Sequence, residues 1–195
     1  MRFREILKFS MVAIIGFLGV CCSLTDMQES REIAAKDFYG VMLDGVGDVN
    51  IYYAEDYKVI VNAASKIHDI VVIDVSNNIL HIGEKHKNGF NPIKLSVDVY
   101  MPELKNIDLK GTGDIKIVNG KTSNFEIINS GKGNIDAQNY EAENVIVNHS
   151  GIGNINTWVT KSLTGKHSGI GDILYKGNPS INKIKITGIG KVKKM

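Results

Sequence analysis

The stretch Ser150-Gly151-Ile152-Gly153-Asn154-Ile155 decides the fold that the sequence predicts, because close copies of it occur six times in one chain. Each copy has two glycines separated by one residue, and five of the six carry Asp or Asn directly after the second glycine. Their first glycines are 66, 20, 20, 18 and 19 residues apart, which gives the second half a period near 20 residues. The glycines of these turns are Gly45, Gly47, Gly111, Gly113, Gly131, Gly133, Gly151, Gly153, Gly169, Gly171, Gly188 and Gly190.

The residues around each Gly-x-Gly alternate between apolar and polar, which is typical of strands. Val145-Ile146-Val147 precedes one copy, and Ile155-Asn156-Thr157 follows it. No segment of helical periodicity joins the copies, so helical crossovers are not expected between parallel strands. We therefore expect an all-β fold, a parallel β-helix-like β-solenoid with coils of about 20 residues, over residues 38–195. The glycines would form the corners, where positive φ is needed.

The earlier part of this domain, residues 38–108, is strand-like but lacks regular glycines. Asn77-Asn78 lies between two apolar runs and predicts a hairpin turn. This part is expected to form less regular N-terminal strands, either as opening coils or as an antiparallel flank.

The Asp and Asn that follow the second glycine are predicted to close the turns by bonding nearby backbone N–H groups. Calcium binding is less favoured, because one oxygen ligand per 18 to 20 residues is too few. His149 and His167 occupy the same position of the repeat and are expected to form a ladder on the surface, without a metal site. No cofactor is expected. The Asp/Asn column of the regular array is Asp114, Asn134, Asn154 and Asp172.

The N-terminus resembles an export signal. A basic start is followed by the twelve-residue apolar run Phe9 to Val20, which is too short to span a bilayer. Both cysteines of the chain follow at once, and Cys21 or Cys22 is the predicted lipid-accepting cysteine of a lipoprotein. An uncleaved anchor or ordinary signal cleavage are the alternatives. The predicted signal peptide covers residues 1–21, and residues 22–37 are a polar tether.

Charge argues against nucleic acid as a partner. Without the charged residues of the leader, the chain has 23 − 3 = 20 basic and 21 − 1 = 20 acidic side chains, a net charge of zero. Binding to phosphates requires a clustered basic surplus. The lysines near the C-terminus are interpreted as a solubilising cap.

The repeat also resembles a known family, the putative auto-transporter adhesin, head GIN domain. Gly151-Ile152-Gly153-Asn154-Ile155 is similar to its signature, and so is the approach Val97-Asp98-Val99-Tyr100-Met101-Pro102-Glu103-Leu104. The resemblance covers about residues 38–194. It implies a β-solenoid on a secreted or lipid-anchored protein of the bacterial envelope, and it supplies no catalytic residues.

Three functions follow from these features. The first hypothesis is a non-enzymatic envelope lipoprotein, anchored to the outer membrane, that binds glycan or protein with Trp158 and Tyr175 as candidate stacking platforms. The second is a structural scaffold that associates with itself. The third and least favoured is an enzyme active on polysaccharides, with Asp48, Asp114 and Asp172 as acids.

Overall fold

The computed structural model describes residues 28–85 and 95–195. The expected signal peptide, with Cys21 and Cys22, lies outside the described residues. Within the described ranges, no helix is both long enough and apolar enough to cross a bilayer.

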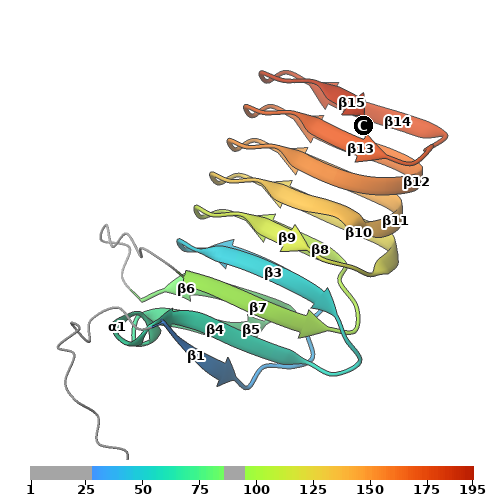
Figure 1. Ribbon diagram of the computed structural model, residues 1–195. Coiled ribbons are helices and arrows are strands. Elements are labelled where there is room, and N and C mark those ends of the chain that lie inside the picture. Colours follow the sequence, from blue (N-terminus) through green and yellow to red (C-terminus); the bar gives the residue numbers. More distant parts are fainter. Residues whose placement is uncertain (1–27, 86–94) are drawn as a thin grey trace, which may run out of the picture.

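The described chain forms one mixed sheet of fifteen strands around a single core (Figure 1). Neighbouring strands follow the order β1-β4-β7-β3-β9-β11-β10-β8-β2-β6-β5, so the sheet runs up one side, turns at β11 and returns down the other. The first side holds β1 (Gln28–Ile33), β4 (Lys58–Ala64), β7 (Leu95–Met101), β3 (Asp48–Tyr53) and β9 (Ile115–Ile117). The second side holds β5 (Val71–Ser76), β6 (Ile79–Glu84), β2 (Gly40–Asp44), β8 (Asn106–Leu109) and β10 (Lys121–Asn129). The remaining elements are α1 (Ser65–His68), β11 (Ile135–His149), β12 (Ile155–His167), β13 (Ile173–Lys176), β14 (Ile181–Ile186) and β15 (Val192–Lys194).

The prediction of an all-β fold is right, but the prediction of a regular β-solenoid is wrong. The strands form a nearly closed barrel of mixed direction, in which β4 is antiparallel to both β1 and β7, and β5 is antiparallel to β6. The cause lies in the 66 residues between the first two Gly-x-Gly copies. Within this segment β5 and β6 are consecutive strands joined by a tight turn and pair antiparallel, whereas β4 lies between β1 and β7, which are not its neighbours in the sequence.

One of these reversals was predicted. Asn77 and Asn78 join β5 to β6 as the expected hairpin, and both have positive φ, 52° and 60°. Asparagine tolerates this conformation, which two-residue hairpin turns of the primed type require at both positions. Strand β1 pairs antiparallel with β4 and occupies part of residues 22–37, the stretch expected as a tether.

From β8 onward, all strand pairs are parallel, and equivalent residues beside successive Gly-x-Gly turns pair with one another. Part of β12 pairs with β13, which in turn pairs with β15, while the rest of β12 pairs with β14. Both sides of the sheet therefore continue to the C-terminal end. One inward row along these strands is Ile115, Ile135, Ile155, Ile173 and Val192.

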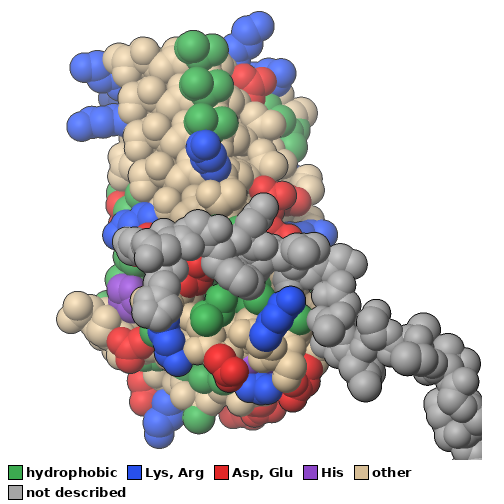
Figure 2. Space-filling view, turned by 90° about the vertical axis from the view of Figure 1, so that its left-hand side faces the viewer, with side chains coloured by type: hydrophobic (Ala, Val, Ile, Leu, Met, Phe, Trp, Pro, Cys, Tyr) green, Lys and Arg blue, Asp and Glu red, His purple; other side chains and the backbone are tan. Residues whose placement is uncertain are grey.

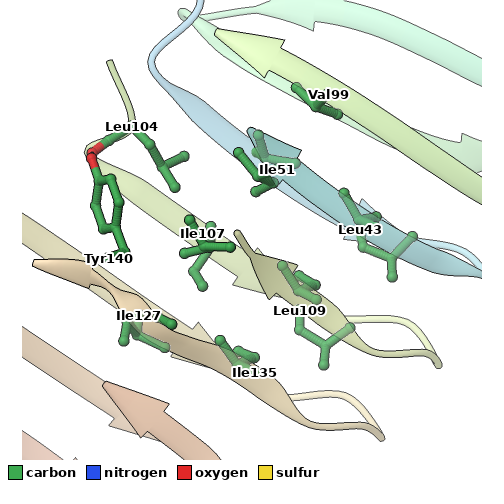
Figure 3. Packing of buried hydrophobic residues seen from close by; sticks show 14 of the residues in the cluster. Leu43, Ile51, Val99, Leu104, Ile107, Leu109, Ile127, Ile135 and Tyr140 are labelled. Atoms are coloured by element: carbon green, nitrogen blue, oxygen red, sulfur yellow. The ribbon is translucent and has the colours of Figure 1, made fainter. Parts of the chain in front are cut away.

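The core is a column of aliphatic side chains between the two sides of the sheet (Figure 3). Ile107, Ile127 and Ile135 are fully buried there. Burying each such side chain contributes roughly 1.5–3 kcal/mol. Tyr140 closes one side of the column: its ring meets Phe125 edge-on, and its hydroxyl donates a hydrogen bond of 2.6 Å to the carbonyl oxygen of Leu104.

Candidate functional site

The Asp and Asn side chains beside the Gly-x-Gly turns bond between turns. The Asp114 carboxylate accepts a hydrogen bond from the backbone N–H of Asn134, and the Asn134 side-chain oxygen accepts one of 2.9 Å from the N–H of Asn154. Asn154 and Asp172 accept in the same way from the turns that follow them. These residues were expected to bond backbone N–H groups of their own turns. Each instead accepts a hydrogen bond from the backbone N–H of the next turn in the stack.

Two consequences follow for this column. The last copy of the repeat has Lys191 where the other copies have Asp or Asn. The backbone N–H of Lys191 is the last donor in this column of hydrogen bonds and bonds to the Asp172 carboxylate at 2.9 Å. Bonds from the Lys191 N–H and from Lys193 lower the pKa of the exposed Asp172 carboxyl. A carboxylate held ionised in this way is a poor general acid. Asp114 and Asp172 are also three strand steps apart, roughly 14 Å at 4.8 Å per step, which is too far for a pair of glycosidase carboxylates. Asp48 lies one turn from Asp114, but its carboxylate accepts a hydrogen bond of 2.9 Å from the Asp114 N–H and so has the same structural role.

His149 and His167 lie inside the molecule, so the expected surface ladder is not what the structure shows. Their side chains are 1% and 0% exposed, and the rings stack with centroids 4.9 Å apart and planes 8° from parallel. Such parallel rings do not converge their nitrogens on one ion. Burial, followed by the neighbouring His167, lowers the pKa of His149. In the described part of the chain, no three His, Cys, Asp or Glu side chains gather to form a metal site.

The two predicted stacking residues do not form one platform. Trp158 and Thr157 are consecutive on β12, and Tyr175 is paired with Thr157. Thr157 is fully buried, so Tyr175 lies on the inward side, where it packs against the core. Trp158 therefore points to the opposite side, and the Lys176 ammonium covers its ring at 4.0 Å from the centroid.

A concave surface, called the groove below, lies beside β8, β10 and β11 and has a volume of about 910 Å³. It combines two partly exposed apolar groups, Tyr39 and Ile146, with a majority of amide, hydroxyl and charged side chains. Its lining residues come from separate parts of the chain: Tyr39, Glu103, Lys105, Asn106, Lys121, Thr122, Ser123, Asn124, Phe125, Glu126, Glu141, Glu143, Asn144 and Ile146.

Hydrogen bonds order the amide groups of the groove. The Asn144 amide nitrogen donates to the Asn124 side-chain oxygen at 3.2 Å, and the Ser162 hydroxyl donates to the Asn144 oxygen at 2.8 Å. At the other end, Lys105 lies 4.9 Å from the centre of the Tyr39 ring and pairs with Glu103 at 3.0 Å. The polar groups are therefore held in place before a ligand arrives, which lowers the entropic cost of binding.

Four carboxylates and two ammonium groups line the groove, which makes it net acidic. A neutral, hydroxyl-rich ligand suits it better than a polyanion, because carboxylates repel anions and accept hydrogen bonds from hydroxyls. Sequence reasoning missed these residues. The repeat position shared by Asn124 and Asn144, twenty residues apart, was the available signal.

The chain belongs to the family described as "Putative auto-transporter adhesin, head GIN domain", which matches residues 37–119 and again residues 109–179. The resemblance inferred from the Gly-Ile-Gly-Asn repeat is therefore confirmed. Membership of an adhesin family indicates an extracellular or envelope-associated protein. No curated protein matches the sequence.

Several solved structures are similar to this chain. A crystal structure of a putative adhesin from Bacteroides fragilis has a TM-score of 0.62 at 22% identity, covering 87% of this chain and 97% of that chain. A putative lipid binding protein from Parabacteroides distasonis gives 0.46 at 20% identity, over 86% of this chain and 96% of that one. A putative adhesin from Parabacteroides merdae gives 0.45 at 18% identity, with the same two coverages. At this identity, the first likeness shows a shared fold and nothing about a ligand.

Proposed function

We propose that this chain is a non-enzymatic adhesion module that binds an uncharged glycan in the groove. The observation that carries this proposal is the groove itself, an ordered concave surface of about 910 Å³ with many hydrogen-bonding groups. Adhesion is the role that the family description names. The turn carboxylates support the absence of catalysis, because Asp114 and Asp172 are used as acceptors for backbone N–H groups.

The chemistry of the groove fits a sugar chain. Sugar hydroxyls both donate and accept hydrogen bonds, and the amides of Asn124 and Asn144 do the same. The Tyr39 ring is 37% exposed and can pack against a pyranose ring, although the Lys105 ammonium lies over one of its faces, 4.9 Å from the centroid. Lys105 on that ring and its partner Glu103 fix the position of this end of the groove.

Replacing Tyr39 with Ala tests the proposal. The variant is expected to bind at least about tenfold more weakly to the glycans that the wild-type chain retains on an array of neutral and acidic glycans, because it loses the stacking surface. Tyr53→Ala is the matched control: Tyr53 is 55% exposed and lies outside the groove. Equal loss in both variants, or retention by acidic glycans alone, contradicts the proposal.

Trp158→Ala/Tyr175→Ala addresses the alternative site predicted from the sequence. If glycan retention survives Tyr39→Ala but disappears in this double variant, the ligand binds over β12 and β13 and not in the groove. Unchanged retention in the double variant supports the groove.

We further propose that the module is an outer-membrane lipoprotein attached through Cys21 or Cys22. The apolar run that ends at these residues supports this location. Cells expressing the full chain and fed labelled fatty acid are expected to label the protein, and the label should disappear when both cysteines are replaced by Ser. Label that persists in that double variant contradicts lipid attachment.

A further inference from the structure

Both ends of the sheet expose edge strands in the described part of the chain. At the C-terminal end, β14 pairs only with β12, and β15 pairs only with β13. At the opposite end, β1 pairs only with β4, and β5 pairs only with β6. Each of these strands has one row of backbone N–H and C=O groups without a strand beside it, and such edges are templates for pairing with another chain.

The C-terminal end also leaves the core uncovered. Ile186 continues the inward column of His149 and His167 but is 46% exposed, whereas the two histidines beneath it are buried. Ile189 at the last turn is 71% exposed, more than its outward-facing equivalents Ile152 and Ile170 in the preceding turns, which are 48% and 49% exposed. Stacked folds need a cap at such an end, because exposed apolar side chains favour association.

The two ends have opposite charge. Residues 173–195 contain six lysines and no acidic residue, a net charge of +6. Residues 28–85 contain ten acidic and five basic residues, 5 − 10 = −5. Figure 2 shows Lys side chains around the upper end of the molecule, and most Asp and Glu side chains of that view in its lower half. When two ends meet, their charges come within the Debye length of about 8–10 Å, so this charge distribution favours head-to-tail contacts and disfavours contacts between like ends.

We propose that copies of this chain assemble head to tail, with the C-terminal end of one copy covered by the β1–β5 end of the next. The directions of the strands fit this arrangement. Strand β1 is antiparallel to β4, which is antiparallel to β7, so β1 runs in the direction of the parallel strands on its side, including β15. Simple stacking then places β15 beside β1 in parallel.

The second side of the sheet continues in the same contact. Strand β5 is antiparallel to β6, which is parallel to β2 and, through it, to the strands that lead to β14. Stacking therefore places β14 beside β5 in antiparallel register. Lys183 and Lys185 of β14 would approach Asp74 of β5. Two copies joined by their C-terminal ends would instead bring twelve lysines together.

Charge reversal on one end at a time tests the contact. Lys183→Glu/Lys185→Glu makes β14 acidic, and Asp74→Lys/Ser76→Lys makes the outward positions of β5 basic. Full chains with two different tags are co-expressed and purified in mild detergent, and recovery of one tag with the other is measured. Each variant is expected to lose about tenfold or more of the co-purification with itself, because like charges then face each other.

Mixing the two variants gives the decisive outcome. The acidic β14 of the first variant faces the basic β5 of the second, so co-purification is expected to return to near the wild-type amount. If co-purification is the same in the wild type and in every variant, the copies merely share detergent micelles, and the proposal is overturned. It is also overturned if the mixture of the two variants does not regain co-purification. Circular dichroism of each variant should match the wild type, since all four positions are on edge strands.

Cross-linking identifies the surfaces directly. A photoreactive phenylalanine analogue at Ile189 of the full chain, irradiated in intact cells, is expected to link to peptides from residues 28–85 of a second copy. Links to the C-terminal end of another copy, or only to another protein, overturn the arrangement. Tyr39→Ala should leave the cross-link unchanged, so loss of glycan binding and loss of assembly are distinguishable.

Discussion

Gly153→Ala is expected to lower the free energy of unfolding by about 4 kcal/mol, the sum of backbone strain and overpacking. Gly153 has φ of 137°, a conformation that L-residues with a side chain rarely adopt. A methyl group there would also lie 2.0 Å from the carbonyl oxygen of Gly133 in the preceding turn. Because that atom belongs to backbone hydrogen-bonded in the stack, neither turn can move without breaking ladder bonds. Urea-induced unfolding followed by circular dichroism measures the loss.

Gly83→Ala is the matched control for this prediction. Gly83 lies in β6, and a methyl group added to it would come no closer than 3.6 Å, to the carbonyl oxygen of Asp44. Its φ is not positive, so the change should stay within about 1 kcal/mol. If both variants lose the same small amount, the turns are not as tightly stacked as the structure shows.

The second half of the fold was largely predictable from the sequence, because the glycine period fixed where each turn occurs. Turns 18 to 20 residues apart bring equivalent residues side by side, as the pairing of Ile135 with Ile155 shows. The first half carried no such period. Apolar alternation over residues 38–108 predicted strands, but alternation does not specify a neighbour or a direction. Asn77-Asn78 indicated the β5–β6 hairpin, but the antiparallel pairs of β4 with β1 and β7, and with them the nearly closed mixed sheet, could not be predicted.

The site was less predictable than the fold. The groove joins Tyr39 and Glu103 to strands β10 and β11, and only the topology brings these distant segments together. Outward side chains also carry no hydrophobic pattern that could reveal them. Trp158 and Tyr175 were predicted as aromatic stacking platforms, yet they lie on opposite sides of the sheet, with Tyr175 packed against the core.

The inward position of the histidines could have been predicted. His149 lies two residues before a Gly-x-Gly turn, and the same position in other copies is Leu109 and Ile186. Apolar residues at equivalent positions indicate an inward row, which the register confirms. The row also contains Asn129, whose amide donates to the Gly133 carbonyl oxygen at 3.0 Å.

His149→Leu is expected to make the protein more resistant to acid. Burial and the neighbouring His167 lower the pKa of His149 in the folded state below its ordinary value near 6.5. The unfolded chain therefore binds a proton at this position more readily than the folded chain does. The neutral His149 contributes fully to the free energy of unfolding above about pH 6.5, and this contribution is lost as the pH falls below that value. Protonation would place a charge beside a stacked ring 4.9 Å away, inside the core. Leucine occupies the equivalent position at Leu109 and cannot be protonated.

The test compares unfolding by urea at a series of pH values from about 4 to about 8. Wild-type stability should fall more steeply than that of His149→Leu on the acid side of pH 6.5, and the two curves should run in parallel above it. Equal slopes in wild type and His149→Leu would mean that His149 binds no fewer protons when folded than when unfolded, and the stacked pair would not be the origin of acid sensitivity.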